Sequence, residues 1–381
     1  MPKTVKVFIL AALVLLMGSW QTYAFADWLS GWSYRKQITI SNTNVTADLS
    51  NYPLLVKLTN DANVGTGVSD TTYGYDIRFT DSGGTTLLPY ERESFSVTSG
   101  QATANFWVKV PTITTASATT VYIYYGNSSQ AGSDWTASGT PTQAQNVWDT
   151  NYKGVWHLAS TSVTDSTQNG NNGTNSGATA TTDKIDGSLY FDGASGWYLG
   201  LPFPAISGDW TLEMWLYQTS SAAYLTIFDV SGRSICFFIN ATTGNTSWSD
   251  GLLSGTLLTG SYTSGFGLTP SAWHRLVFAR TGSTCYWYVD GVEKCTLSNS
   301  ITFTAKTVHF GDNPSTGGSL YPGKYDEIRL STFRRPASWI KFAYYNDSSA
   351  TNELNFAAQE GGSTSLKFEG IQMEGVKVPS Y

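Results

Sequence analysis

The chain has 381 residues, of which 13% are charged and 14% are aromatic, and its formal net charge is −6. The charged share is roughly half of what soluble globular proteins usually carry, and Lys and Arg are nowhere clustered, which argues against a nucleic-acid partner. The length favours two domains, each large enough for its own core. Abundant Gly, Ser, Thr and Asn beside many aromatic residues are typical of an all-β exported protein.

The N-terminus has the pattern of a secretory signal. Lys3 and Lys6 form a basic start, residues 7–17 are an uncharged apolar run, and Ala24-Phe25-Ala26 supplies a small-x-small cleavage site. The apolar run is shorter than the roughly 20 residues that a membrane-spanning helix needs. We therefore predict a signal peptide over 1–26 and a secreted or cell-surface protein with no membrane association after cleavage. A retained N-terminal anchor is the alternative.

Residues 27–127 predict a small β-sandwich domain. Strict period-two alternation over 106–110 and 121–125 indicates strands that bury one face each. Turns rich in Gly, Asn, Asp and Ser separate the predicted strands, which are 34–40, 53–58, 76–80, 87–91, 104–110 and 120–125.

This first domain resembles a known bacterial family. Three segments carry the resemblance, namely the runs 32–40 (Trp-Ser-Tyr-Arg-Lys-Gln-Ile-Thr-Ile), 75–81 (Tyr-Asp-Ile-Arg-Phe-Thr-Asp) and 124–127 (Tyr-Tyr-Gly-Asn). They are similar to a domain of unknown function that often precedes LamG-like modules in exported proteins. The resemblance implies no activity. The following segment, 128–147, is rich in Ser, Thr, Gly, Ala and Pro and predicts an inter-domain linker.

The second domain is marked by short alternating runs that end at turn residues. In order they are Val155-Trp156-His157-Leu158, Tyr190-Phe191-Asp192-Gly193, Thr211-Leu212-Glu213-Met214-Trp215, Trp273-His274-Arg275-Leu276-Val277-Phe278, Tyr286-Trp287-Tyr288-Val289-Asp290-Gly291 and Tyr325-Asp326-Glu327-Ile328-Arg329-Leu330. This order resembles the LamG-like jelly roll of the concanavalin A-like lectin/glucanase superfamily over 148–360. The predicted fold is thus all-β, an N-terminal small β-sandwich followed by a concanavalin A-like jelly-roll sandwich, with 336–345 as the one expected helix.

The pattern of carboxylates in the sequence argues against glycoside hydrolysis. Glycoside hydrolysis uses two carboxyl groups about 5–9 Å apart, which laminarinase-like relatives of the fold supply as Glu-x-Asp-x-x-Glu. That motif is absent, Glu213 stands alone in its strand, and the pair Glu91 and Glu93 is expected to meet solvent at a strand exit. We predict that the protein is not an enzyme. A polysaccharide-cleaving enzyme that uses Glu213 is the least favoured alternative.

The three histidines do not predict a zinc site. His157, His274 and His309 are scattered, and neither His-x-x-x-His nor Cys-x-x-Cys spacing occurs. His157 and His274 each follow a Trp inside a strand pattern, which predicts hydrogen-bonded histidines in the core or at a sheet edge.

Calcium is the predicted ion, with a structural role. The loop 165–173 is dense in carboxylate and amide oxygens, which calcium prefers, although it does not have EF-hand spacing. The resemblance to the jelly-roll family implies Asp326 as a ligand, with Asp192 as a second candidate. The alternative is that Asp192 caps a turn and Asp326 pairs with Arg329 or Arg275.

Three cysteines, an odd number, imply one disulfide and one remaining thiol, or an intermolecular bond, in an exported chain. Cys285 and Cys295 flank the turn at Asp290-Gly291. A two-residue turn would set Cys285 opposite Thr296, whereas a three-residue loop with a bulge would set it directly across from Cys295. We favour the disulfide between Cys285 and Cys295 and leave the first register open.

The predicted function is binding or adhesion at a cell or particle surface, with glycan as the leading ligand. Trp197, Trp248 and Tyr262 lie in Gly/Ser/Thr-rich contexts and are candidates for exposed stacking faces. The tail 361–381 carries two short Gly-bounded repeats with strand-like spacing. The alternative is therefore a structural subunit of an extracellular filament, sheath or virion that self-assembles or docks through this tail.

Overall fold

The structure is a computed structural model, and it describes residues 27–194, 196–219, 225–230, 236–240, 245–249, 268–298, 302–312, 321–348 and 353–361. The predicted signal peptide and almost all of the tail 361–381 lie outside these residues. Within the described part of the chain, no helix is long and apolar enough to cross a membrane.

The first domain consists of two antiparallel sheets, as the alternation predicts. Its elements are β1 (Tyr34–Ile40), β2 (Leu49–Asp61), α2 (Ala62–Gly67), β3 (Arg78–Thr80), β4 (Leu87–Leu88), β5 (Tyr90–Thr98), β6 (Gln101–Ile113), β7 (Thr119–Tyr125), β22 (Leu354–Phe356) and β23 (Glu360–Gly361). One sheet has the order β22-β1-β7-β3-β4, with β23 also beside β1, and the other has the order β2-β6-β5. Apolar side chains of both sheets form a shared core.

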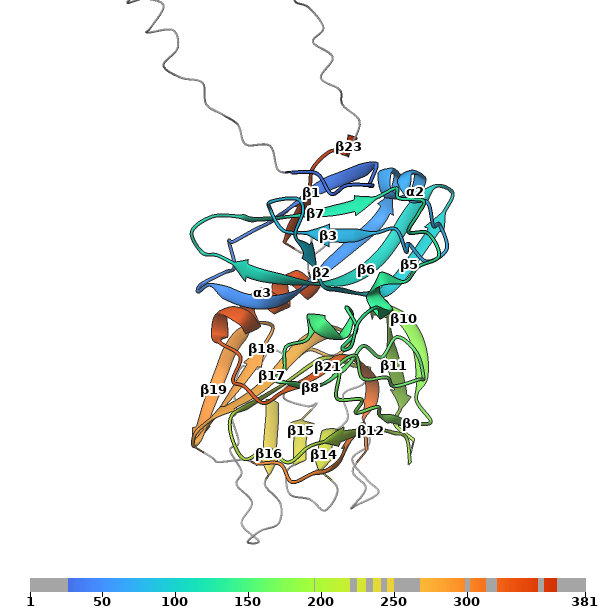
Figure 1. The fold of residues 1–381 in the computed structure, drawn as a ribbon. Helices are drawn as coiled ribbons and strands as arrows, with labels where there is room; N and C mark the ends of the chain where they lie inside the picture. The colour runs from blue at the N-terminus through green and yellow to red at the C-terminus, as the bar shows by residue number, and fades with distance from the viewer. Residues whose placement is uncertain are drawn as a thin grey trace, which may run out of the picture.

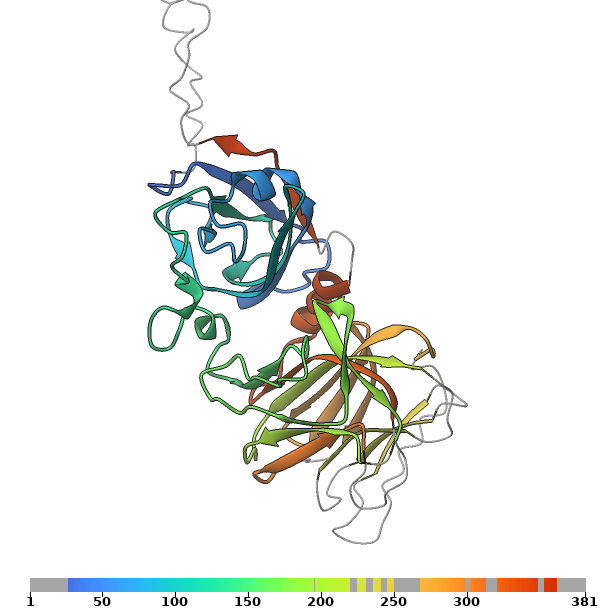
Figure 2. The ribbon, with the colours of Figure 1, turned by 90° about the vertical axis from the view of Figure 1, so that its right-hand side faces the viewer.

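The last described residues, 354–361, pair with the first domain. Ile38 of β1 pairs with Phe356 of β22, and Tyr34 pairs with Gly361 of β23, as the red strands beside the upper domain show (Figure 2). The expected end of the jelly roll at 360 is thus corrected, because 354–361 complete the first sheet.

The expected linker also belongs to the first domain. It contains two short helices, η1 (Trp135–Ala137) and η2 (Gln145–Val147). Val147 is fully buried in the first-domain core, and Trp135 packs against the same core. The segment is therefore docked along much of its length.

The second domain is a sandwich of two larger antiparallel sheets. Its strands are β8 (Tyr152–Trp156), β9 (Thr174–Ser176), β10 (Thr179–Ile185), β11 (Gly187–Asp192), β12 (Tyr198–Phe203), β13 (Trp210–Gln218), β14 (Leu225–Val230), β15 (Cys236–Asn240), β16 (Asn245–Ser249), β17 (Trp273–Thr281), β18 (Thr284–Val289), β19 (Val292–Ser298), β20 (Lys306–Phe310) and β21 (Pro322–Ser331). The eight-stranded sheet has the order β10-β11-β21-β13-β17-β18-β19, with β8 paired to β21, and the six-stranded sheet has the order β16-β15-β14-β20-β12-β9. The predicted all-β fold is confirmed.

The inner face of the eight-stranded sheet is apolar. Leu212, Met214 and Leu276 lie on this face, in a core cluster that also contains Leu199 and Val308 of the six-stranded sheet. Alternation of side chains along each strand sends the intervening residues to the opposite face. The composition of that opposite face determines how the two domains meet.

The outer face of the eight-stranded sheet is covered by the first domain and by α3 (Ala337–Ser348), which lies between the domains (Figure 1). The helix is close to the predicted 336–345. Trp339 and Phe342 of α3 pack on Tyr52 of β2, with ring centroids 4.7 and 5.1 Å apart. The side-chain amide of Asn346 bonds both backbone groups of Leu55, at 2.9 Å and 3.0 Å. The domains therefore share a buried interface.

Candidate functional site at the domain interface

The interface contains a cluster of buried ionisable side chains. Strand β5 of the first domain contributes carboxylates. The residue that follows β8, strands β13, β17 and β21 of the second domain, and α3 contribute the other members, which carry both signs of charge. The members are Glu91, Glu93, His157, Glu213, Arg275, Asp326, Glu327, Arg329 and Asp347. Charged side chains are almost never fully buried unless they are paired, so this cluster is the most distinctive chemical feature of the described chain.

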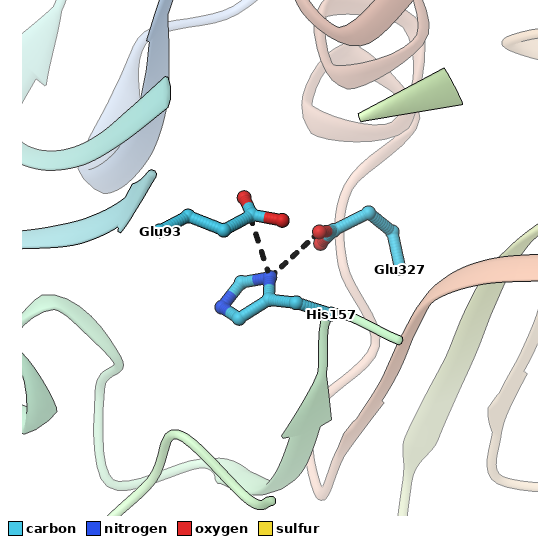
Figure 3. Close-up of side chains that lie close together, drawn as sticks. All are labelled: Glu93, His157 and Glu327. Carbon is cyan, nitrogen blue, oxygen red and sulfur yellow. Dashed lines mark hydrogen bonds and ion pairs between the residues drawn. The ribbon is translucent and has the colours of Figure 1, made fainter. Parts of the chain in front are cut away.

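Three members of the cluster converge on one point (Figure 3). The His157 Nδ1 atom lies 2.6 Å from Glu327 Oε1 and 3.8 Å from Glu93 Oε2. One potential ligand atom from each of the three residues lies within 4.8 Å of the other two. The Glu93 side chain is only 4% exposed and that of Glu327 is fully buried. The group therefore brings a nitrogen and two carboxylates together in a site closed to bulk water.

Both glutamates stand at irregularities of their strands. The pairing of β5 with β6 shifts between Arg92 and Ser94, which leaves Glu93 as the extra residue. The pairing of β13 with β21 also shifts, and Glu327 adopts a φ of +51° there. Such bulges re-aim side chains and occur preferentially near functional sites.

The shift in β21 has a specific consequence. It lets the consecutive residues Asp326 and Glu327 both turn away from the apolar core, while Tyr325 and Ile328 on either side stay in that core. In a regular strand, one of the two acidic residues would point inward. The bulge thus places the Glu327 carboxylate opposite His157.

Each of the three residues is held from outside by a further partner. Glu93 Oε2 accepts a hydrogen bond from Trp107 Nε1 at 2.8 Å. Glu327 Oε2 accepts from Arg329 Nη2 at 2.7 Å. His157 Nε2 lies 3.3 Å from Glu91 Oε2. These contacts fix the orientation of the three side chains around their common point.

Glu91 is itself anchored. Its Oε2 accepts from Trp148 Nε1 at 2.7 Å, and its Oε1 accepts from the Ser166 hydroxyl at 2.6 Å. The imidazole of His157 also stacks on Trp107, with ring centroids 5.7 Å apart and an interplanar angle of 16°. Both domains thus contribute to the wall of the site, because Glu91 and Trp107 come from the first domain and Ser166 from the second.

Burial and charge move the pKa values of the site in different directions. Burial alone would lower the pKa of His157, but the carboxylates of Glu327, Glu93 and Glu91 raise it well above its ordinary value. Burial raises the pKa of Glu93 well above the usual range of a glutamate. Burial would also raise the pKa of Glu327, yet His157 and Arg329 hold it below its ordinary value. The carboxylates thus favour the protonated form of His157, and His157 and Arg329 favour the ionised form of Glu327.

Glu213 does not face a substrate cleft. Its carboxylate accepts a hydrogen bond from Arg275 Nη2 at 2.5 Å, and Arg275 also contacts Asp347 of α3. All three side chains are at most 2% exposed. The carboxylate that was considered for polysaccharide cleavage is thus enclosed in the interface.

The two predicted calcium ligands do not fit a shared site. Both carboxylate oxygens of Asp326 accept backbone N–H groups, from Ile185 at 3.0 Å and from Glu327 at 2.8 Å. Asp192 is exposed and caps a turn by accepting from the Ala194 N–H at 2.6 Å. It pairs with Pro322, four positions from Asp326 along β21. Asp192 therefore caps a turn in the structure, which is the alternative role given for it from the sequence.

The loop 165–173 is organised by its own hydrogen bonds. Asp165 Oδ1 accepts from the N–H groups of Val155 and Thr167, and its Oδ2 accepts from the Asn171 N–H. Asp165 is buried. Its oxygens are thus engaged by backbone donors, which is a structural role that needs no ion.

The three predicted ligand-binding aromatic residues are placed to different degrees. Trp197 is half-buried, packs against the core of the second domain and lies close over Gly177. Trp248 lies in β16 opposite Phe237, but its side chain is outside the described part of the structure, as is all of Tyr262. The structure therefore does not bring the three together.

The hairpin β18–β19 corrects the expected cysteine register. Val289 pairs with Val292 across a two-residue turn, and a bulge then shifts the pairing so that Cys285 lies opposite Leu297 and Cys295 opposite Trp287. Neither of the two registers considered from the sequence occurs. The direct opposition on which the predicted disulfide depended is not formed.

The residues that converge at the interface were given other roles from the sequence. Glu91 and Glu93 were expected to meet solvent. His157 was expected to be a hydrogen-bonded histidine in the core or at a sheet edge, so its hydrogen bonding was anticipated but its position beside two glutamates was not. One local signal pointed here, namely the consecutive acidic residues Asp326 and Glu327 inside an otherwise apolar strand. Their contacts with residues of the first domain leave no pattern in the local sequence.

Comparisons with known families agree with the two-domain organisation. Residues 73–150 match the family described as Domain of unknown function (DUF2341). Residues 198–341 match the Concanavalin A-like lectin/glucanases superfamily. No curated protein matches the chain.

Solved structures with a similar fold cover half of the chain. The binding domain of Paraclostridial Mosquitocidal Protein 1 is 10% identical, with a TM-score of 0.42, over 51% of this chain and 52% of that chain. Domain 4 of AbnA, an extracellular arabinanase from Geobacillus stearothermophilus, solved with arabinotriose, is 19% identical over 50% of this chain and 97% of its own, with a TM-score of 0.41.

A third similar structure is the ligand-binding domain of botulinum neurotoxin serotype D with N-acetylneuraminic acid. It is 12% identical over 51% of this chain and 50% of its own, with a TM-score of 0.41. The chain thus spans about half the length of the first and third of these structures. On the family matches, the protein carries a domain of unknown function followed by a concanavalin A-like lectin/glucanase domain.

Proposed function

We propose that this protein is an exported, non-catalytic binding or adhesion protein that recognises glycans at a cell or particle surface. One observation supports the proposal above the others. The second domain has a lectin/glucanase fold, but the face of its eight-stranded sheet that bears carboxylates is buried under the first domain and α3. Glu213 and Glu327 are engaged there by Arg275 and Arg329. The scaffold for binding is retained while its acidic face is closed to a substrate.

The ligand would bind on the side of the second domain away from the interface. Tyr198 of β12 stacks on His309 of β20, with ring centroids 4.1 Å apart and parallel planes, and both residues are half-buried. Trp197 directly precedes this pair. Aromatic faces beside polar groups suit sugar rings, which offer apolar C–H faces and hydroxyl groups. Trp197 and Tyr198 are therefore the described residues proposed for stacking, together with Trp248 and Tyr262, whose side chains lie outside the described part of the structure.

A glycan array probed with the secreted chain tests the proposal. We expect a defined set of bound glycans, with binding weakened by Trp197→Ala and by Tyr198→Ala. Tyr73→Ala is the matched control, because Tyr73 is an aromatic residue of the first domain that is 54% exposed, and it should leave binding unchanged. Absence of binding to every glycan, or release of cleaved sugar from a bound one, would contradict the proposal.

A structural subunit is the second candidate function. The observation that favours it is that β22 and β23 lie along β1 of the first domain, so residue 361 ends at this sheet. A tail that leaves from there is placed to pair with a neighbouring molecule. Truncation after Gly361 keeps both strands. Loss of assembly with glycan binding intact would favour this candidate, and unchanged assembly would rule it out.

A further inference from the structure

We propose that Glu93, His157 and Glu327 form a binding site for a divalent transition-metal ion of the zinc class, which ties the two domains together. This site is separate from the proposed glycan-binding surface. It combines one ligand of the first domain with two of the second, so an ion bound here would contact both domains at once.

Glu93 contains a buried oxygen that forms no hydrogen bond. Glu93 Oε1 has no hydrogen-bond partner and is inaccessible to solvent, whereas Glu93 Oε2 is engaged by Trp107. A buried acceptor without a donor is costly, and such atoms are rare in folded proteins. The carboxylate faces His157 (Figure 3), with Oε2 3.8 Å from His157 Nδ1, and a cation beside this carboxylate would satisfy its second oxygen.

The contacts outside the group leave one ligand atom of Glu327 and one of His157 facing each other. Arg329 engages Glu327 Oε2, so Oε1 faces His157 Nδ1. Glu91 Oε2 lies 3.3 Å from His157 Nε2, which forms no hydrogen bond in the structure. When an ion is bound, an Nε2–H group would face Glu91 and the Nδ1 lone pair would face the ion in place of its present hydrogen bond to Glu327. Carboxylate–histidine–metal arrangements of this kind orient the ligand in many metal sites.

The net charge that the group would have in the metal-bound state also suits a divalent ion. In the metal-bound state Glu91, Glu93 and Glu327 would contribute three negative charges, and Arg329 would contribute one positive charge. With His157 neutral in that state, the group would have a net charge of −2, which a divalent ion neutralises. Uncompensated charge is expensive in a buried site.

The ligand set selects the kind of ion. One imidazole nitrogen with carboxylate oxygens suits zinc, manganese and iron, whereas calcium prefers six to eight oxygens. Ligand atoms lie about 2.0–2.2 Å from zinc, so the ion would replace the proton between His157 Nδ1 and Glu327 Oε1 and widen their 2.6 Å contact. The ligands are far apart in the sequence, which explains why motif spacing gave no indication of zinc.

The test uses the full chain, produced with Zn²⁺ and then dialysed. We expect elemental analysis to find one zinc per chain and thermal unfolding to occur at a higher temperature than in the metal-stripped protein. Glu93→Gln should lower zinc affinity by more than about 100-fold, because it changes a ligand, and Glu91→Gln by about 10–100-fold, because it changes an outer contact. Glu93→Gln keeps the side-chain shape, so its metal-free protein should melt at or above the wild-type temperature.

His274→Gln is the matched control, because His274 forms a histidine–carboxylate pair with Asp290 at 2.8 Å elsewhere in the second domain. It should retain one zinc per chain. Cobalt substitution gives an independent readout, with visible absorption bands in the wild type that Glu93→Gln lacks. A wild-type chain without zinc after dialysis, or Glu93→Gln with wild-type affinity, would overturn the proposal.

Discussion

The two faces of the eight-stranded sheet are built from the same strands but are filled by opposite chemistry. Leu212 and Met214 point into an apolar core, whereas Glu213 between them is paired with Arg275 under the first domain. Antiparallel sheets commonly leave one face to solvent, and here that face is buried as well. Apolar packing tolerates small shifts, but charge pairs are satisfied only in a defined geometry. Alternation along one strand can thus supply an apolar face that stabilises its own domain and a charged face that orients the neighbouring domain.

The largest effect is expected from removing a cation of the outer face. Arg329→Ala would leave Glu327 and Asp347 without its charge and remove its contact with Trp107, whose ring lies 4.2 Å away. The free energy of unfolding should fall by about 3–5 kcal/mol, as measured by urea titration. Arg334→Ala is the control, since Arg334 lies only half-buried over Tyr286 and should cost less than about 1 kcal/mol. Equal effects for the two variants would mean that the outer face is not buried.

The inner face should respond to a lost apolar side chain. Leu212→Ala removes buried methyl groups from the core cluster, and such changes cost about 2–5 kcal/mol. Leu87→Ala, at a leucine that is 39% exposed, should stay within about 0.5 kcal/mol of wild type. Urea unfolding of both variants measures the difference. If Leu212→Ala were as mild as the control, the apolar packing assigned to this face would be wrong.

A smaller effect is expected where α3 joins the first domain. Asn346→Ala would leave the buried N–H and C=O groups of Leu55 without their partner, at a cost of about 1–3 kcal/mol. Hydrogen exchange should become faster at Leu55. Asn42→Ala serves as the control, because Asn42 donates to the Thr115 carbonyl at an exposed position. Unchanged exchange at Leu55 would show that this contact does not hold the interface.

The last effect is a pH dependence at Lys184, which lies over the ring of Trp215. Burial lowers its pKa from 10.5 to about 8. Between these two values the unfolded chain binds more protons than the folded chain, so this lysine makes stability rise with pH across that window. Lys184→Met should thus be more stable than wild type at neutral pH, with the advantage shrinking as pH rises from about 8 to 10.5.

Melting temperatures across this pH range, compared with those of Lys184→Met, measure the effect. The exposed residue Lys294 provides the control, since Lys294→Met should follow the wild-type curve throughout. A constant offset between Lys184→Met and wild type at every pH would contradict the assignment to Lys184.

The fold was largely accessible from the sequence, because strand alternation is a local pattern. The run 211–215 predicts a strand, and the structure has β13 there. The same pattern fails at β18–β19, since a bulge shifts the backbone pairing so that Cys295 pairs with Trp287. It also fails for 354–361, whose pairing with β1 depends on contacts across almost the whole chain.

The candidate site was not accessible from the sequence for a physical reason. Alternation shows that Glu91 and Glu93 share a face of β5, but it cannot show whether another domain covers that face. The ion ligand expected in the last strand motif was Asp326, whereas its neighbour Glu327 faces His157 because of the bulge. Only tertiary packing brings these residues together.

Anomalous diffraction at the zinc absorption edge, from crystals of the zinc-loaded chain, would locate an ion in the cluster on the outer face of the sheet, which we propose ties the two domains together. We expect one strong peak about 2.0–2.2 Å from ligand atoms of Glu93, His157 and Glu327. The contradictory result is density that shows no peak there, with His157 Nδ1 still hydrogen-bonded to Glu327.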